Sequence, residues 1–201
     1  MKKYYFLLIS LLFVFTIQAQ KFNGGVMLGF TGSQVAGDND GGYNKAGLFA
    51  GGFVNLKIGS RSLLQLELEF MQKGSRHNPN FDKGDFTSKL IRLAYVEMPL
   101  LYQYIISDKF KIEAGPSLAV LIDSFEEYNG VEGDRENFRL LHLCLNAGVY
   151  YSLTDKILLN LRTNNSLINI RNQNVTGDVH RLIDHGQYND VLSFSVFYHF
   201  K

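Results

Sequence analysis

The chain has 201 residues, a formal net charge of +1, 46% hydrophobic residues and one cysteine. The near-zero charge gives no electrostatic reason to expect a nucleic acid partner, and the lone Cys144 leaves no pair for an internal disulfide. After the first 20 residues no apolar run approaches the roughly 18 residues of a membrane helix. A soluble fold or a membrane β-barrel, whose strands alternate apolar and polar residues, therefore remains.

The N-terminal segment has the pattern of a secretory signal peptide. Lys2 and Lys3 precede an apolar run from Tyr4 to Ile17, and the small residue Ala19 follows. The run is shorter than the about 20 residues that a spanning helix needs. We expect a signal peptide over residues 1–19 and a single barrel domain over residues 20–201.

Alternation with a period of two predicts eight β-strands in the rest of the chain. The expected ranges are 22–33, 45–58, 63–73, 90–106, 109–122, 140–153, 156–167 and 190–200. In the fourth range Pro99 cannot donate to a strand ladder, which predicts a bulge near Met98 and Pro99.

The connections between these strands alternate in length. Three are tight, at residues 59–62, 107–109 and 154–156, whereas those at 34–44, 74–88, 123–137 and 169–189 are long. Short periplasmic turns alternating with long external loops are typical of outer-membrane barrels. The sequence thus predicts an all-β fold, an eight-stranded antiparallel up-and-down transmembrane β-barrel.

The segment LLQLELEF (63–70) raises the question of which strand face meets water. Glu67 and Glu69 share one face, and Leu64, Leu66 and Leu68 share the other. Two carboxyl groups at this spacing of roughly 7 Å invite a glycosidase interpretation. However, an eight-stranded lumen is already filled by its own side chains, so we expect no catalytic residues here.

Few charges lie on the predicted strands, and both signs are present in similar number. Such a set suits a paired network in a narrow lumen, because an unpaired buried charge costs several kcal/mol. We expect a structural lumenal network of Glu67, Glu69, Arg92, Lys111, Glu113 and Arg162. No residue spacing points to a cofactor or a metal site, since His180 and His185 lack a third ligand nearby.

Seven segments, taken in order, carry a resemblance to a known family. They are GGVMLGFTGSQVAGD, GGYNKAGLFAGGFVN, LQLELEFMQKGS, LAYVEMPLLYQY, KFKIEAGPSLAVLI, NAGVYYSLTDKI and GQYNDVLSFSVFYHF. Together they resemble the PorT-like outer-membrane β-barrel family of Gram-negative bacteria. The resemblance implies an eight-stranded barrel in the cell outer membrane. It also implies an aromatic end, Phe200, for the barrel-assembly machinery, and a link to type IX protein secretion through the family's namesake.

Three functional hypotheses follow. The first is a non-enzymatic outer-membrane barrel that acts through its external loops or its periplasmic rim, in partner binding, adhesion or support of secretion. Its partners would be the lipid bilayer, the assembly machinery and another envelope protein. The second is a soluble periplasmic barrel that binds a small apolar ligand, with its apolar face inside. The third is a diffusion pore, for which the narrow, charged lumen predicts almost no conductance.

Overall fold

The computed structural model describes residues 22–38, 40–133, 138–171, 179–182 and 184–200. The predicted signal peptide lies outside these described residues. Eight long strands form the barrel: β1 (Phe22–Ala36), β2 (Lys45–Lys57), β3 (Ser62–His77), β4 (Lys89–Ile105), β5 (Phe110–Tyr128), β7 (Leu141–Ser152), β8 (Ile157–Ser166) and β11 (Tyr188–His199). Smaller elements are the 3-10 turn η1 (Phe81–Lys83) and the strands β6 (Val131–Glu132), β9 (Val179–Arg181) and β10 (Asp184–Gly186).

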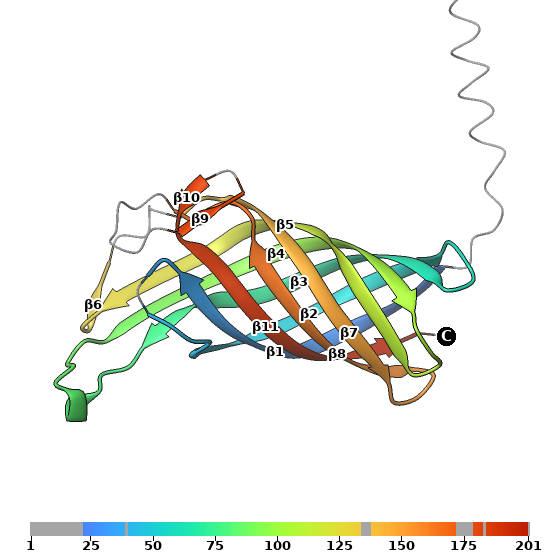
Figure 1. Ribbon diagram of the computed structural model, residues 1–201, viewed down its shortest axis with the longest axis horizontal. Helices are drawn as coiled ribbons and strands as arrows, with labels where there is room; N and C mark the ends of the chain where they lie inside the picture. The colour runs from blue at the N-terminus through green and yellow to red at the C-terminus, as the bar shows by residue number, and fades with distance from the viewer. Residues whose placement is uncertain (1–21, 39, 134–137, 172–178, 183, 201) are drawn as a thin grey trace, which may run out of the picture.

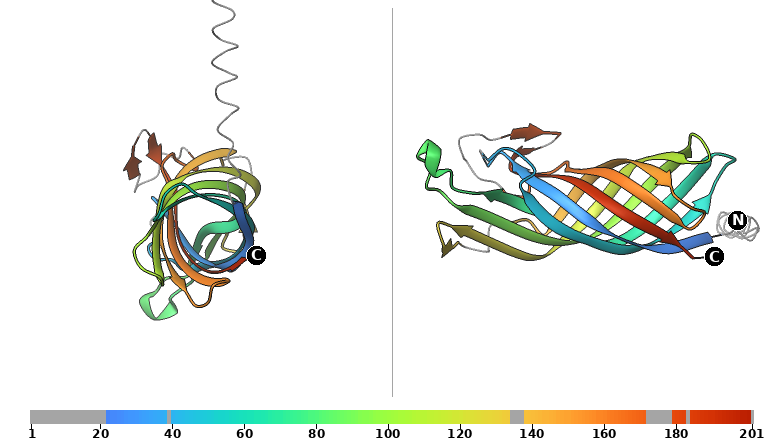
Figure 2. Two further views of the ribbon diagram at one scale, coloured as in Figure 1. Left: turned by 90° about the vertical axis from the view of Figure 1, so that its right-hand side faces the viewer. Right: turned by 90° about the horizontal axis from the view of Figure 1, so that it is seen from below.

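The eight long strands close into one antiparallel barrel (Figures 1 and 2). Each pairs with its neighbours in the chain, and β1 pairs with β11 from Gly25 opposite His199 to Ala36 opposite Tyr188. Closure leaves no unpaired strand edge within the wall, which a bilayer requires. The predicted fold class is confirmed.

Short and long connections lie at opposite ends of the barrel. The turns after β2, β4 and β7 are short, and the described chain ends lie beside them (Figure 2). The turn between β2 and β3 closes with Ile58 and Gly59 both donating to the Ser62 carbonyl. We call the end with the long connections the external end and the other the periplasmic end.

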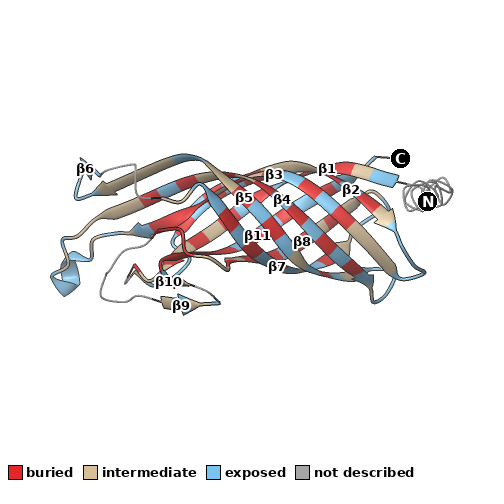
Figure 3. Cartoon of the chain, turned by 90° about the horizontal axis from the view of Figure 1, so that it is seen from above, coloured by how far each residue is buried: buried red, intermediate tan, exposed pale blue. Residues whose placement is uncertain are grey.

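Within the barrel wall, burial alternates along most of each long strand and forms diagonal stripes (Figure 3). On β3, Gln65, Glu67 and Glu69 are buried while Leu66 and Leu68 are exposed. The inside of the barrel is therefore rich in polar groups, and the outside is apolar, the reverse of a soluble barrel.

The predicted bulge near Pro99 is wrong. Pairing of β4 with β5 runs without a shift from Tyr95 to Pro99, and the register changes between Ala94 and Tyr95, where Ile122 of β5 is the extra residue. Pro99 is tolerated because the ladder with β3 gives no partner to Met98 or Pro99, so its missing N–H interrupts no bond there.

Candidate functional site

Arg162 of β8 forms the centre of the lumen. Its two terminal nitrogens lie 2.7 and 2.8 Å from the Glu67 carboxylate oxygens, and its Nε lies 2.8 Å from Glu113 Oε1. The three side chains are 0% exposed. The fork geometry of a guanidinium suits two carboxylates at once, so β3, β5 and β8 are linked across the lumen.

Glu69 lies in the same cluster but is bound differently. Its carboxylate is 3.6 Å from Arg162 Nη1, and neither oxygen accepts a hydrogen bond from any described residue. Three buried carboxylates therefore surround one guanidinium. The acid pair predicted as neighbours on one strand thus splits into a strongly bonded member, Glu67, and a weakly bonded one.

A second, balanced cluster lies nearer the external end. Lys73 Nζ is 2.7 Å from Glu97 Oε2 and 2.7 Å from Asn164 Oδ1. Asn164 donates to Glu97 Oε1 at 2.6 Å, and Ser117 Oγ donates to the same oxygen. Glu97 is therefore held by one cation and two neutral donors, as a buried carboxylate requires.

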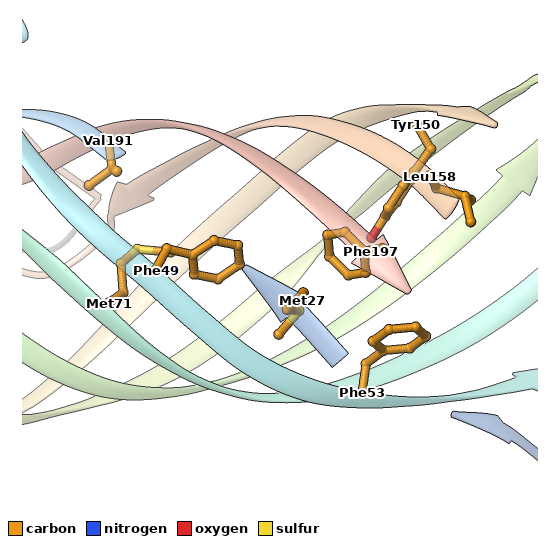
Figure 4. Packing of buried hydrophobic residues seen from close by; sticks show 8 residues of the cluster. All are labelled: Met27, Phe49, Phe53, Met71, Tyr150, Leu158, Val191 and Phe197. Atoms are coloured by element: carbon orange, nitrogen blue, oxygen red, sulfur yellow. The ribbon is translucent and has the colours of Figure 1, made fainter. Parts of the chain in front are cut away.

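Apolar side chains fill the lumen beside these charges. One cluster, drawn in Figure 4, comprises Met27, Phe49, Phe53, Met71, Tyr150, Leu158, Val191 and Phe197. Another, towards the external end, comprises Val35, Ile91, Leu93, Tyr95, Ala119, Cys144 and Ile170. The lumen is thus a packed core with charges in it, as in other narrow barrels.

Four of the six residues predicted for the lumenal network meet there: Glu67, Glu69, Glu113 and Arg162. Lys111 lies on the inward side of β5, half-buried, with its Nζ 4.8 Å from the centroid of the Tyr150 ring. Among the described residues it makes no ion pair.

The prediction that Arg92 lies in the lumen is wrong. Arg92 is exposed on the outer face of β4, with its guanidinium carbon 4.4 Å from the centroid of the Phe125 ring. The inward face of this strand carries Ile91 and Leu93, because the lumen is apolar at this level. Polarity alone therefore misassigned the two faces.

Lys73 and Glu97 were missing from the predicted network. Strand parity could have found both, since Lys73 lies an even number of residues after Glu67 and Glu69 and so shares their face of β3. Glu97 likewise shares its face with Gln103, which is buried at the other end of β4.

The outer wall is a belt of exposed apolar residues. Examples from five strands are Leu28, Val54, Leu68, Leu100 and Phe194, which are 44–64% exposed. Such a belt is stable only when lipid covers it, so the soluble apolar-ligand barrel is rejected. No helix among the described residues is long and apolar enough to span a membrane.

Three strands continue beyond the wall at the external end. Pairing of β2 with β3 stops at Phe49 opposite Met71, and pairing of β5 with β7 stops at Val120 opposite Leu141. The ladders that join β3, β4 and β5 run on to His77 and Tyr128. We call residues 76–90 and 122–133 the external extension; it carries η1 and β6 (Figure 1).

Ion pairs brace the long connections at the external end. Arg171 donates to both Glu126 oxygens at 2.6 and 2.9 Å, and Arg181 donates to both Asp190 oxygens at 2.7 Å. Bidentate pairs of this kind fix orientation as well as position. The last long connection is therefore tied to both β5 and β11.

His77 joins two loops of the external end. Its Nδ1 is 2.8 Å from Asp40 Oδ1, and its Nε2 is 2.6 Å from Asp85 Oδ2. Carboxylates only accept, so both ring nitrogens carry protons in this arrangement. The hydrogen bond with Asp85, followed by the charge of Asp40, raises the pKa of His77 above its ordinary value.

The pKa of Asp85 is shifted in the opposite direction. The backbone N–H of Thr87, followed by the hydrogen bond with His77, lowers the pKa of Asp85. Within the described ranges no three His, Cys, Asp or Glu side chains gather as a metal site. The rings of His180 and His185 are tilted by 49° to each other, with centroids 4.4 Å apart.

Comparison with known proteins agrees with the barrel architecture. The chain is similar to Neisserial surface protein A (NspA), with 13% identity over 88% of this chain and 97% of that one, at a TM-score of 0.58. It is also similar to Ail, the attachment invasion locus protein of Yersinia pestis, crystallised with the heparin analogue sucrose octasulfate. The identity there is 9% over 90% of this chain and 99% of that one, at a TM-score of 0.52. At these identities the likeness shows the fold alone.

Curated proteins give no match to the sequence. A family model described as "Outer membrane protein beta-barrel domain" matches residues 18–172, more than half of the chain. Together with the lipid-facing belt, this match confirms the predicted location in the outer membrane. The chain belongs to the outer membrane protein beta-barrel domain family and is an integral protein of the outer membrane.

Proposed function

We propose that this protein is a non-enzymatic binding protein of the outer membrane, and that its external extension is the part that contacts a partner protein. The observation that carries the proposal is the apolar tip of the extension. Phe81 and Phe86 are 69% and 71% exposed, with ring centroids 5.6 Å apart. Exposed aromatic residues beyond a membrane belt are typical of protein interaction sites.

The lumen supports this proposal by its contents. Arg162 pairs with Glu67 and Glu113 and Lys73 pairs with Glu97 inside it, and apolar and neutral polar side chains pack beside them. A transport route or an active site would need a lumen that water and substrate can enter. We therefore assign the network around Arg162 a structural role.

The resemblance to the PorT-like family adds a narrower form of the proposal. In that form the partner is another envelope protein, and the complex supports protein secretion. Export by the segment 1–19 and insertion by the barrel-assembly machinery would precede this role. The periplasmic rim is the alternative contact surface, but its turns are short and offer little area.

A sulfated sugar, such as the heparin analogue sucrose octasulfate in the Ail complex, is not favoured here. At the external end Arg171, Arg181 and Arg139 are each paired with a carboxylate. Polyanion binding by these groups would have to break those pairs first.

Site-specific photo-crosslinking in the native host tests which surface is used. A photoreactive residue at Phe86 samples the external extension, and one at Asp108 samples a periplasmic turn. We expect a discrete protein adduct from position 86 and none from position 108. Adducts from position 108 alone would overturn the proposal in favour of the periplasmic rim.

A paired variant tests the apolar tip itself. The double substitution Phe81→Ser and Phe86→Ser should abolish an adduct formed from a probe at Asp82, whereas Lys83→Ser on the same turn should leave it intact. Heat-modifiable migration on SDS gels confirms that each variant is folded. An adduct that survives the double substitution contradicts the assigned role of the tip.

Planar bilayer recordings separate this proposal from the diffusion pore. The folded protein should give no steps above background, because side chains from both apolar clusters occupy the lumen. Regular conductance steps would favour the pore hypothesis instead.

A further inference from the structure

A cavity at the external end of the wall contains two cations that pair with no carboxylate of the described residues. Its volume is about 310 Å³, and its lining includes Lys45 of β2, Arg92 of β4 and Asp123 of β5. A water molecule takes about 30 Å³ of liquid. The cavity therefore has room for a tetrahedral oxyanion.

Lys45 is the first unusual group. The residue is 5% exposed, and its Nζ makes one long hydrogen bond, 3.3 Å to the Ala46 carbonyl. No carboxylate of the described residues lies within ion-pair distance of it. Buried lysines are normally paired, since an isolated buried charge is costly.

Arg92 is the second unusual group in the cavity. Phe125 holds the guanidinium at 4.4 Å from its ring centroid, which orients the group without using its N–H donors. None of the side-chain hydrogen bonds among the described residues involves Arg92. Five N–H donors are therefore free for a ligand.

Among the described residues, Asp123 is the one carboxylate that lines the cavity, and it is exposed. It makes no ion pair with either cation. The lining consequently keeps a net positive charge, and two like charges share one small space. An anion between them would remove their repulsion.

The position in the barrel indicates the source of such an anion. On the outer face of β4, Leu100, Met98 and Val96 belong to the apolar belt, and Arg92 is the first charged residue beyond them. Basic residues at this level meet lipid headgroups. We propose that Lys45 and Arg92 form a binding site for a phosphate group, carried by a membrane lipid headgroup or by free phosphate.

The test uses the full-length protein in nanodiscs. The two probes are inorganic phosphate and a lipid with a phosphomonoester headgroup, phosphatidic acid, in a phosphatidylcholine background. Native mass spectrometry counts retained lipid, and calorimetry measures phosphate binding. Retention of phosphatidic acid without measurable phosphate binding assigns the lipid source, and saturable phosphate binding assigns the free anion.

Four variants test the expected direction of change in binding. Lys45→Met and Arg92→Gln should each weaken binding about tenfold, as loss of a charge-assisted hydrogen bond does. Asp123→Asn should strengthen phosphate binding severalfold, because it removes a negative charge that repels the phosphate. Arg76→Gln, which removes an exposed cation of β3 that does not line the cavity, should change nothing.

Arg92→Gln still tests the proposal if Lys45→Met fails to fold. Arg92 is exposed on the outer face, so this substitution leaves the packed interior unchanged. Equal binding by wild type and Arg92→Gln would overturn the proposal. So would the absence of binding to both probes, or an equal loss in Arg76→Gln.

Discussion

The lumen and the external extension both contain cations set between two carboxylates, yet the two arrangements differ in their access to water. Arg162 between Glu67 and Glu113 is wholly buried, whereas His77 between Asp40 and Asp85 is 30% exposed. Water can replace a lost partner at the surface and cannot do so in the lumen. The same kind of ion pair therefore contributes very differently to the free energy of unfolding in the two places.

Removal of the central cation should have the largest effect. Arg162→Met leaves Glu67 and Glu113 buried without a counter-charge, and we expect a loss of about 3–5 kcal/mol in the free energy of unfolding. Urea titration in lipid vesicles measures it. An unchanged midpoint would mean that water enters the lumen and solvates these acids.

The balanced cluster should show strong coupling. Lys73→Met and Glu97→Met should each destabilise the barrel by about 3 kcal/mol, because each leaves one buried charge alone. The double variant should recover part of the loss, with a coupling energy of about 1–3 kcal/mol in a double-mutant cycle. Additive losses would show that the two groups do not act as a pair.

The two neighbouring glutamates offer a matched comparison within one strand. Glu69→Gln should change the free energy of unfolding by less than about 1 kcal/mol, because no described residue donates to its carboxylate. Glu67→Gln should cost about 2–3 kcal/mol, because the amide keeps one acceptor oxygen for Arg162 and sets an NH2 group against the other guanidinium nitrogen. Equal costs for the two substitutions would contradict the assigned asymmetry of the acid pair.

The smallest effect concerns pH at the external end. Because the pKa of His77 is raised, its link between Asp40 and Asp85 is complete below about pH 6.5, the unfolded value, and is lost as pH rises through the folded value. An NMR titration of the His77 ring should give a pKa above 6.5, and Asp85→Asn should lower it. A midpoint at or below the ordinary value in the wild type would show that the link is absent in solution.

Much of the barrel could be predicted from the sequence because its wall repeats a local rule. Alternation on β3 distinguished Glu67 and Glu69 from Leu66 and Leu68, and tight turns stood out by their composition. The rule failed on β4, where Ile91 and Arg92 exchanged faces. There the lumen is apolar, so polarity no longer marks the inside.

The external extension could not be predicted from strand periodicity. Its form depends on where the ladders from β2 and β7 stop, and those limits are set by residues distant in the chain. The cavity that contains Lys45 and Arg92 likewise combines four strands. A periodic pattern describes one strand at a time and gives no such distances.

The hydrogen bonds between Arg162 and Glu67 join residues 95 positions apart, and the seam between β1 and β11 joins the two ends of the described barrel. Contacts so distant in sequence form slowly, because the entropy of loop closure is lost before they contribute. Until the seam closes, these charges would face lipid or remain in water. Insertion and closure must therefore proceed together, and an open sheet that lacks β11 would be an unstable intermediate.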